Sequence, residues 1–412
     1  MVELSAPGGN LEKLKIAVIY GADAVYIGGE KFSLRTKADN FSREEMKEGI
    51  DFAHEYGRKV YVTLNMIPRN EDFRGMEEYI REIRDMGADA VIVSDPGIFR
   101  LVKDVAPELK IHISTQANNT NYMGAKFWRE QGASRIIAAR ELTCGEITEI
   151  HDKNPDLEIE IFVHGAMCIS YSGRCLLSEY MTGRDSNRGD CAQSCRWNYR
   201  LSEEKRPDEY FPVYENERGT YIFNSKDLCL IEYIPELIGS GAASLKIEGR
   251  MKSLFYVAST VRAYREAIDR YYEFPGKWKC DPKWLREVSM ASHRKYTSGF
   301  FINENKEPAN KQIYETNSYI RDYDFIGMCE KYDPDARLIW VIQKNKVSTG
   351  DDIEVMTPSG EDLFFKVAGL YDENDNLMES APHAGMMFKI KIGDTGRDVL
   401  IEPYSLIIKK SR

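Results

Sequence analysis

The chain has 412 residues, of which 42% are hydrophobic and 30% are charged, and its formal net charge is −10 at pH 7. This composition is typical of a globular cytoplasmic protein, and the acidic balance excludes a polycation that coats duplex DNA while allowing a local basic patch for a folded RNA. The longest apolar runs, such as IIAA at 136–139, are far too short to cross a membrane.

Strand-like and helix-like segments alternate along the first part of the chain. Short β-branched runs, each followed by an amphipathic helix, predict parallel strands that are covered on both faces. The helices begin at capping signals such as Asn10, Ser42 with Glu45, and Thr143 with Glu146, and several end at glycine. Eight such units predict a (β/α)₈ TIM-like barrel, because the G-x-G-x-x-G motif of an open dinucleotide-binding sheet is missing. The expected strands are 4–7, 24–29, 59–66, 90–95, 110–117, 135–141, 158–165 and 243–250.

The seventh unit departs from this repeat. An insertion at 166–238 carries a cysteine-rich stretch, a charged loop and the strand-like sequence TYIFNSKDL. Insertions in such barrels lie on the loops that follow the strands, where catalysis takes place. We therefore place the barrel at 1–275 and a polar connecting segment at 276–318. Alternating strands and turns at 319–412 predict a small C-terminal antiparallel β domain of the barrel type.

Cysteines concentrate in and near the insertion. Clustered thiols in a chain that starts directly with a strand, without a signal peptide, are more often metal ligands or catalytic groups than disulfides. The spacing lacks the Cys-x-x-Cys pair of a zinc module. Wide gaps suit a site assembled from several loops, which favours an iron–sulfur cluster over zinc, with buried structural cysteines as a third interpretation. The cysteines concerned are Cys168, Cys175, Cys191, Cys195 and Cys229.

Polar residues gather where the expected strands end. Lys246, Arg250 and Arg140 together predict a site for a carboxylate or phosphate, although Lys246 and Glu248 could instead pair along one strand face. His164 is either an acid–base or donor group, or a histidine whose hydrogen bonds are satisfied at the start of a loop. The set contains no HExxH motif. It consists of Ser5, Asn65, Asp95, Gln116, Arg140, His164, Asn224, Lys246, Glu248 and Arg250.

The motifs around the cysteines resemble a known family. Residues 160–168 read EIFVHGAMC, and GRCLLS follows after four further residues. This pattern resembles the signature of the U32 "peptidase" family. SAPGG, NRGDCAQSCRW, NSKDLCLI and LKIEGRMKS resemble the family's other blocks, so the resemblance covers roughly residues 2–320. Length, blocks and the appended β domain are most similar to the branch that hydroxylates tRNA.

The resemblance implies oxygen-independent hydroxylation of the tRNA wobble uridine to 5-hydroxyuridine, with prephenate as the hydroxyl donor. It also implies a [4Fe–4S] cluster on Cys168, Cys175, Cys191 and Cys229, with Cys195 as a substitute for Cys191. Prephenate is a dicarboxylate, which suits the cations at the strand ends. We accordingly expect catalytic roles for His164, Lys246, Glu248 and Arg250, and substrate binding by Asn65, Gln116, Arg140, Asn224 and Arg196.

The segments 196–200 and 292–301 are basic and aromatic, so we expect them to meet anticodon phosphates and to stack on an unpaired base. A homo-oligomer or a paralogous partner subunit is a further possible partner. The alternative function is a collagenase-like peptidase, for which Cys168 and His164 are the local nucleophile–base pair. Against it, the sequence supplies no third orienting residue, and a single nucleophile does not explain the other cysteines.

Overall fold

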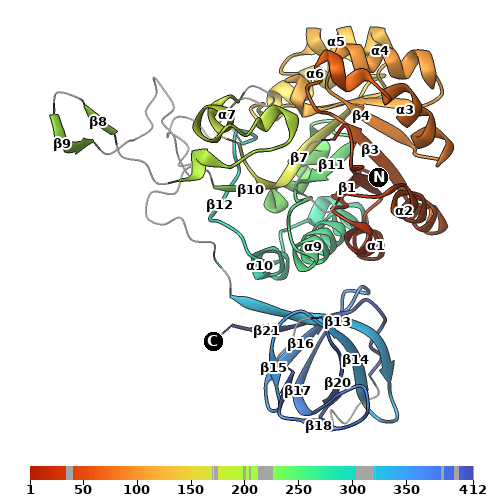
Figure 1. The fold of residues 1–412 in the computed structure, drawn as a ribbon, viewed down its shortest axis with the longest axis vertical. Helices are drawn as coiled ribbons and strands as arrows, with labels where there is room; N and C mark the ends of the chain where they lie inside the picture. The colour runs from red at the N-terminus through yellow and green to blue at the C-terminus, as the bar shows by residue number, and fades with distance from the viewer. Residues whose placement is uncertain are drawn as a thin grey trace.

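The computed structural model consists of an α/β barrel and a smaller all-β domain (Figure 1). None of the helices in the described part of the chain is both long and apolar enough to cross a membrane. The described residues are 1–33, 40–168, 170, 175–197, 201–203, 206–211, 226–302, 320, 322–381, 385–393 and 399–411.

Eight parallel strands form the first barrel, as the repeat predicts. Each strand pairs with the next along the chain, and β11 pairs with both β7 and β1, which closes the sheet. Most residues of these strands are buried, because helices cover the outside while side chains fill the inside. The strands are β1 Glu3–Pro7, β2 Ala24–Ile27, β3 Lys59–Leu64, β4 Ala90–Val93, β5 Lys110–Ile113, β6 Arg135–Ile137, β7 Glu158–Ala166 and β11 Ser244–Ile247.

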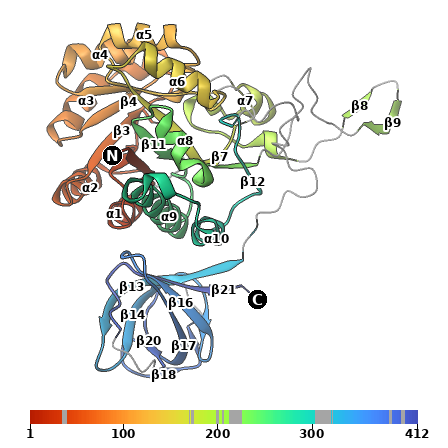
Figure 2. The same ribbon diagram turned by 180° about the vertical axis from the view of Figure 1, so that it is seen from behind.

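The helices surround this barrel (Figure 2). The capping signals act as predicted: Asn10 accepts a hydrogen bond from the Lys13 amide, and Ser42 and Thr143 each form a capping box. The connecting segment expected at 276–318 contains helix α10, which Asp281 caps and whose Trp284 is buried against the barrel. The helices are α1 Leu11–Ile19, α2 Arg43–Glu55, α3 Met76–Asp85, α4 Pro96–Val105, α5 Tyr122–Gln131, α6 Cys144–Lys153, α8 Ile234–Gly239, α9 Leu254–Glu273 and α10 Pro282–Met290.

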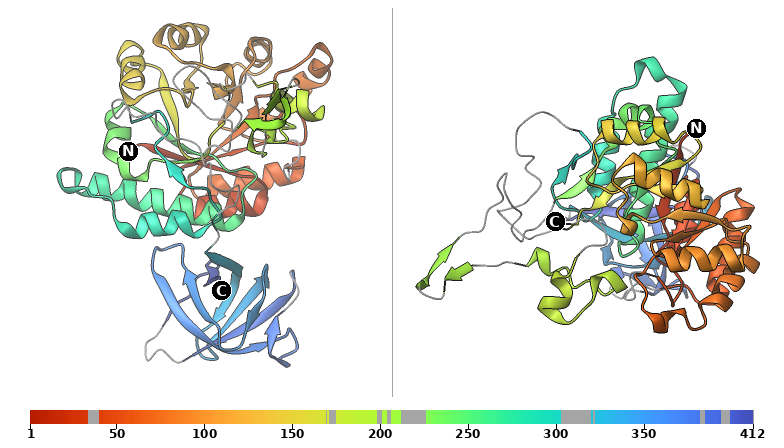
Figure 3. Two further views of the ribbon diagram at one scale, coloured as in Figure 1. Left: turned by 90° about the vertical axis from the view of Figure 1, so that its left-hand side faces the viewer. Right: turned by 90° about the horizontal axis from the view of Figure 1, so that it is seen from above.

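The insertion leaves the barrel between β7 and β11. Strand β10 runs antiparallel to β7 and continues the sheet to β12. The expected strand TYIFNSKDL is described only from residue 226 onward, and most of the charged loop lies outside the described residues. Figure 3 shows α7 and the β8–β9 pair on a side of the barrel that the β domain does not occupy. The elements are α7 Leu177–Thr182, η3 Ser186–Arg188, η4 Ser194–Arg196, β8 Leu201–Glu203, β9 Arg206–Phe211, β10 Asp227–Cys229 and β12 Tyr296–Thr297.

The C-terminal domain is a second closed barrel, as the sequence predicts. Its antiparallel strands follow the order β16, β21, β13, β14, β20, β17, and β17 pairs back to β16. Short strand β18 Leu377–Met378 pairs with β17, and β15 Val347–Ser348 pairs with β19 Ser380–Ala381 in a separate two-stranded sheet. The main strands are β13 Tyr323–Asp333, β14 Leu338–Gln343, β16 Asp352–Met356, β17 Asp362–Tyr371, β20 Met387–Ile392 and β21 Leu406–Lys410.

The two barrels share an interface at α1, α9 and α10. Met356 and Leu406 of the β domain pack into the apolar core of the first barrel. Arg262 of α9 donates to the Thr357 carbonyl and to Asp362 at 2.8 Å each, and the Tyr20 hydroxyl donates to the Met356 carbonyl at 3.0 Å. Buried apolar contacts combined with satisfied polar ones fix the β domain against the outer helices of the barrel.

Candidate active site

A pocket opens at the carboxyl ends of the barrel strands. One wall consists of residues at the strand ends, and the other is the cysteine-bearing part of the insertion. This is the face at which (β/α)₈ barrels carry their active sites. Its lining comprises Tyr26, Thr63, Asn65, Ile92, Ser114, Thr115, Gln116, Ile137, Arg140, Phe162, Cys168, Cys175, Leu177, Ser178, Ser186, Asn187, Cys191, Ser194, Cys195, Lys246, Glu248 and Arg250.

Most of the residues expected from the strand ends meet in this pocket. Asp95 has a different role, because its carboxylate caps α4 by accepting from the Gly97 amide at 2.8 Å. Asn224 lies outside the described residues, and so does the side chain of Arg196. Ser5, His164 and Cys229 do not line the pocket. Those that do line it are Asn65, Gln116, Arg140, Lys246, Glu248, Arg250, Cys168, Cys175, Cys191 and Cys195.

Arginine side chains sit on the strand-end wall. The guanidinium of Arg140 lies 3.8 Å from the centre of the Phe162 ring and pairs with Glu248 at 3.4 Å. Arg250 donates to the Asn40 side chain at 2.7 Å and to the Thr63 hydroxyl at 3.3 Å. These contacts fix both guanidinium groups at the edge of the pocket, where an arriving carboxylate can be bound through charge-assisted hydrogen bonds.

Lys246 lies on the pocket floor and is almost fully buried. Its Nζ is 2.5 Å from a Glu160 carboxylate oxygen and 4.0 Å from the centre of the Tyr26 ring. The interpretation as a Lys246–Glu248 strand pair is therefore corrected: Lys246 pairs across to β7, while Glu248 pairs with Arg140. Burial lowers the pKa of Lys246, and Glu160 offsets only part of that effect.

Sequence reasoning missed Glu160. It lies on β7 directly opposite Ser244 of β11, one inward-facing position below Phe162 and Lys246. An acidic residue in the middle of an otherwise β-branched buried strand was the available signal. Burial raises the pKa of Glu160, but the cations Lys246 and Arg135 lower it by more than burial raises it. The pKa of Glu160 therefore lies below its usual value.

Four thiols face the pocket from the insertion. Burial raises the pKa of Cys175, but hydrogen bonds from Ser170, Ser186 and the amides of Leu177 and Ser178 outweigh burial, so that the pKa lies below its usual value. The Cys191 sulfur accepts from the Gln193 amide at 3.3 Å.

This donor set fits an iron–sulfur cluster in its chemistry, because several thiols share one pocket wall. Within the described residues, however, no three histidine, cysteine or acidic side chains stand close enough together to hold a metal ion. The thiols would therefore have to turn toward one point on binding.

The insertion is fastened to the barrel at one edge of the pocket. Arg188 forms two hydrogen bonds with Asp72, at 2.6 and 3.0 Å, and the Ile67 amide donates to the Asn187 carbonyl at 3.1 Å. The Asn187 side chain then donates to the Cys175 carbonyl at 2.8 Å. This Arg188–Asp72 clasp connects the position of the thiol wall to the loop after β3.

Cys229 lies apart from the four thiols that line the pocket. It is buried on β10, opposite His164 of β7, and its thiol interacts with Tyr264 of α9. Burial raises its pKa to about 12. Cys195 lines the pocket, whereas Cys229 does not.

His164 is likewise directed away from the pocket. The β7–β11 register shifts between Phe162 and His164, and such a bulge redirects the side chains that follow it. The ring packs among Tyr256, Tyr264 and Tyr296, and burial lowers its pKa to about 3. Since His164 is buried outside the pocket that Cys168 lines, it is not placed as the base that the peptidase interpretation pairs with Cys168.

The sequence matches peptidase family U32 over residues 9–311 and the peptidase family U32 C-terminal domain over residues 321–407. The chain therefore belongs to peptidase family U32.

Several relatives carry names that refer to RNA hydroxylation. The chain is 43% identical over 390 residues to tRNA hydroxylation protein P1 of Bacillus subtilis, covering 95% of this chain and 92% of that protein. It is 39% identical to tRNA hydroxylation protein P of Escherichia coli, covering 93% and 92%. It is 38% identical to the 23S rRNA 5-hydroxycytidine C2501 synthase of Escherichia coli, covering 74% of this chain but 46% of that protein.

Proposed function

We propose that this protein hydroxylates RNA, and specifically C5 of the tRNA wobble uridine, in an oxygen-independent reaction that uses prephenate as hydroxyl donor. The observation that carries this proposal is near full-length similarity to relatives named for tRNA hydroxylation. The pocket supports it, because cations suited to a dicarboxylate face thiols suited to a redox cofactor.

In this proposal the cationic wall binds prephenate. Arg140, Arg250 and Lys246 receive its two carboxylates, while Asn65 and Gln116 offer amide groups beside them. The Tyr26 and Phe162 rings line the same space and suit the apolar part of the ring of the donor. The pocket would thus hold one anionic co-substrate in a fixed orientation. Such positioning lowers the entropic part of the reaction barrier.

The proposed cofactor is a [4Fe–4S] cluster. Cys168, Cys175 and Cys191 would hold it with a fourth thiol, which is Cys229 by resemblance to the family and Cys195 by position in the pocket. When bound, such a cluster supplies one-electron redox chemistry.

The proposed RNA site is the rim of the pocket. Trp197 belongs to the basic and aromatic segment at 196–200 and is 47% exposed, and Phe300 belongs to the segment at 292–301 and is 39% exposed. Exposed aromatic rings stack on unpaired bases. The wobble base is unpaired in the anticodon loop, so it enters a pocket at lower cost than a base inside a duplex.

Nucleoside mass spectrometry of total tRNA from a deletion strain tests the function. We expect 5-hydroxyuridine and the nucleosides built on it to disappear once paralogues are also deleted, to return with the wild-type gene, and to stay absent with Cys168→Ala. Unchanged wobble nucleosides in that strain would refute the assignment. Cleavage of denatured collagen that requires both Cys168 and His164 would support a peptidase instead.

A further inference from the structure

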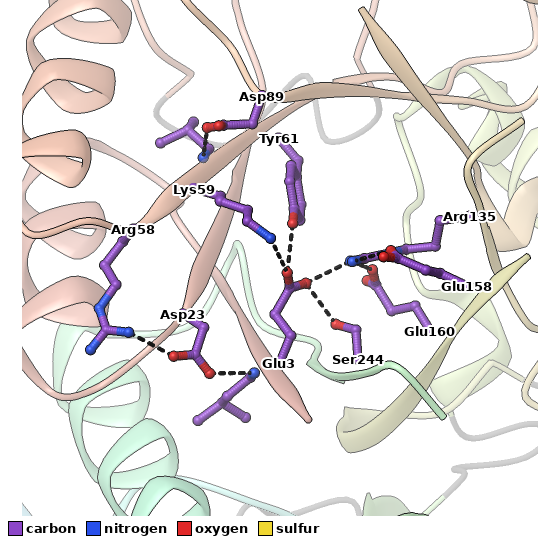
Figure 4. Close-up of polar contacts among 12 residues, drawn as sticks. Glu3, Asp23, Arg58, Lys59, Tyr61, Asp89, Arg135, Glu158, Glu160 and Ser244 are labelled. Atoms are coloured by element: carbon purple, nitrogen blue, oxygen red, sulfur yellow. Dashed lines mark hydrogen bonds and ion pairs between the residues drawn. The ribbon is translucent and has the colours of Figure 1, made fainter. Parts of the chain in front are cut away.

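Charged side chains, among them Glu3, Arg135 and Glu160, contact one another inside the barrel (Figure 4). One carboxylate oxygen of Glu160 lies 2.5 Å from Lys246 Nζ, and the other accepts from Arg135 at 2.9 Å. Glu160 is completely buried, and the other two side chains are at most 4% exposed. Glu160 therefore connects Lys246, which lines the pocket, to Arg135 deeper inside the parallel barrel.

The position of Glu160 is fixed by Arg135, which is in turn bound by other residues of the barrel interior. Arg135 also donates to Glu3 at 2.6 Å, and Glu3 accepts from the Ser244 hydroxyl at 3.0 Å and from the Tyr61 hydroxyl at 2.8 Å (Figure 4). Each of these residues lies on a different strand from Glu160. A carboxylate fixed by several strands can hold a flexible lysine side chain in one orientation.

A lysine buried at this position needs a compensating acid. Transfer of an ammonium group out of water is costly, and a buried lysine without an anion loses its proton instead. The charged or titratable groups that face Lys246 are Glu160, Arg135, His112, Glu248 and the Tyr26 ring. Arg135 disfavours the charged form, Glu248 favours it, and Glu160 favours it through direct contact.

We propose that Glu160 is a positioning residue that keeps Lys246 protonated and directs its ammonium group to the anionic co-substrate on the pocket floor. An ammonium group has three N–H donors, so the bond to Glu160 leaves donors for a carboxylate arriving from the pocket. This inference rests on the proposed function insofar as the co-substrate is a carboxylate. It adds a residue that does not line the pocket and acts through Lys246.

The experiment compares Glu160→Gln with Glu158→Gln in the full chain. Both glutamates bind Arg135, but Glu158 is 53% exposed and makes its contact with Arg135 at 2.6 Å rather than with Lys246. Prephenate binding is measured by calorimetry from about pH 6 to about pH 9. We expect Glu160→Gln to weaken binding roughly ten- to a hundredfold, and Glu158→Gln to change it by no more than about twofold.

The pH dependence of prephenate affinity distinguishes a positioning role of Glu160 from a purely structural one. With a neutral glutamine at 160 the pKa of Lys246 falls further, so the ammonium fraction, and with it prephenate affinity, decreases as pH rises. In the Lys246→Gln background, Glu160→Gln should cause no further loss of affinity. Equal binding by the two glutamine variants, or a further loss without the lysine, would overturn the proposal.

Titration of Lys246, followed through its ¹³Cε resonance, separates this inference from the proposed function. Lys246 should titrate at lower pH in Glu160→Gln than in wild type or Glu158→Gln, and an unchanged titration overturns the inference. Wild-type protein that does not bind prephenate refutes the donor assignment, while the titration still decides the role of Glu160. If Glu160→Gln does not fold, Glu160→Asp retains the charge at a longer distance, and its Lys246 should also titrate below the wild-type pH.

Discussion

The chain contains two closed barrels whose interiors differ. The parallel barrel has Lys246, Glu160, Arg135 and Glu3 stacked beneath an open pocket. The antiparallel barrel is filled mainly by aliphatic and aromatic side chains such as those of Val341 and Phe388. A charged interior lowers stability unless every charge is paired. Among the described residues, the charged stack and the pocket above it both belong to the first barrel.

The largest expected effect concerns the thiols. We expect anaerobically purified Cys168→Ala, Cys175→Ala and Cys191→Ala to lose essentially all iron and sulfide. The informative pair is Cys195→Ala and Cys229→Ala, because Cys195 lines the pocket while Cys229 packs against Tyr264. Iron and sulfide analysis decides which of the two is the fourth ligand. One equivalent of zinc without a visible chromophore in the wild type would exclude the cluster.

The second prediction tests the apolar barrel. Phe388 is completely buried in the β domain, so Phe388→Ala should lower the free energy of unfolding by about 3–5 kcal/mol. Iron content per folded molecule should stay unchanged, because the thiol wall belongs to the other barrel. Phe388→Leu, as the matched control, should lose much less. Denaturant unfolding followed together with iron analysis gives both quantities, and loss of iron from the folded fraction would contradict the separation of roles.

The sequence predicts the architecture, but it does not predict the direction in which every side chain points. Capping boxes, glycine C-caps and β-branched runs are local signals, and they predicted both barrels and the insertion. The sequence did not show that His164 and Cys229 lie outside the pocket, because their direction depends on a register shift between β7 and β11 and on the antiparallel pairing of β10 with β7. Those are contacts between segments distant in sequence, and no local pattern encodes them. For Glu160 a local signal existed, an acidic residue within a buried strand, but its partners Lys246 and Arg135 lie on other strands.

The third prediction separates the pocket cations. Arg250→Ala should weaken prephenate binding roughly ten- to a hundredfold, which corresponds to about 1.5–3 kcal/mol for a charge-assisted hydrogen bond. Its melting temperature should stay close to that of wild type. Lys246→Ala should lose affinity and also melt earlier, because Glu160 loses one of its two cationic partners among the described residues and retains Arg135. Lys366→Ala on the exposed side of β17 is the control. Equal melting of the two pocket variants would contradict a structural role for the Lys246–Glu160 pair.

The fourth prediction concerns the clasp between the insertion and the barrel. Asp72→Asn removes the carboxylate to which Arg188 makes two hydrogen bonds, and this partly exposed pair should contribute about 1 kcal/mol. We expect tryptic cleavage within 176–197 to speed up about fivefold, since local opening becomes easier. Asp190→Asn is the matched control, because its partner Arg184 belongs to the insertion itself. Equal cleavage rates in both variants would show that the clasp does not hold the thiol wall.

The smallest effect is the response of the charged interior to acid. His112 lies in that interior, 2% exposed and edge-on to the Tyr61 ring. Burial lowers its pKa well below 6.5, and Arg135 and Lys246 lower it further. A histidine whose pKa is lower in the folded state contributes stability above its unfolded pKa and loses it as pH falls. The folded state should therefore lose up to about 1.4 kcal/mol per pH unit below about pH 6.5.

Urea unfolding between about pH 7.5 and about pH 5 measures this loss. The variant His112→Phe cannot be protonated, so its stability should fall less steeply with acid than that of wild type. Because the β domain contains Phe388 and Val341 where the first barrel contains charges, a fluorescence probe placed there should report a flatter pH response. If the unfolding free energies of wild type and His112→Phe fall equally steeply with pH, the acid sensitivity arises from other groups. The charged interior of the first barrel would then not explain a difference in acid stability between the two barrels.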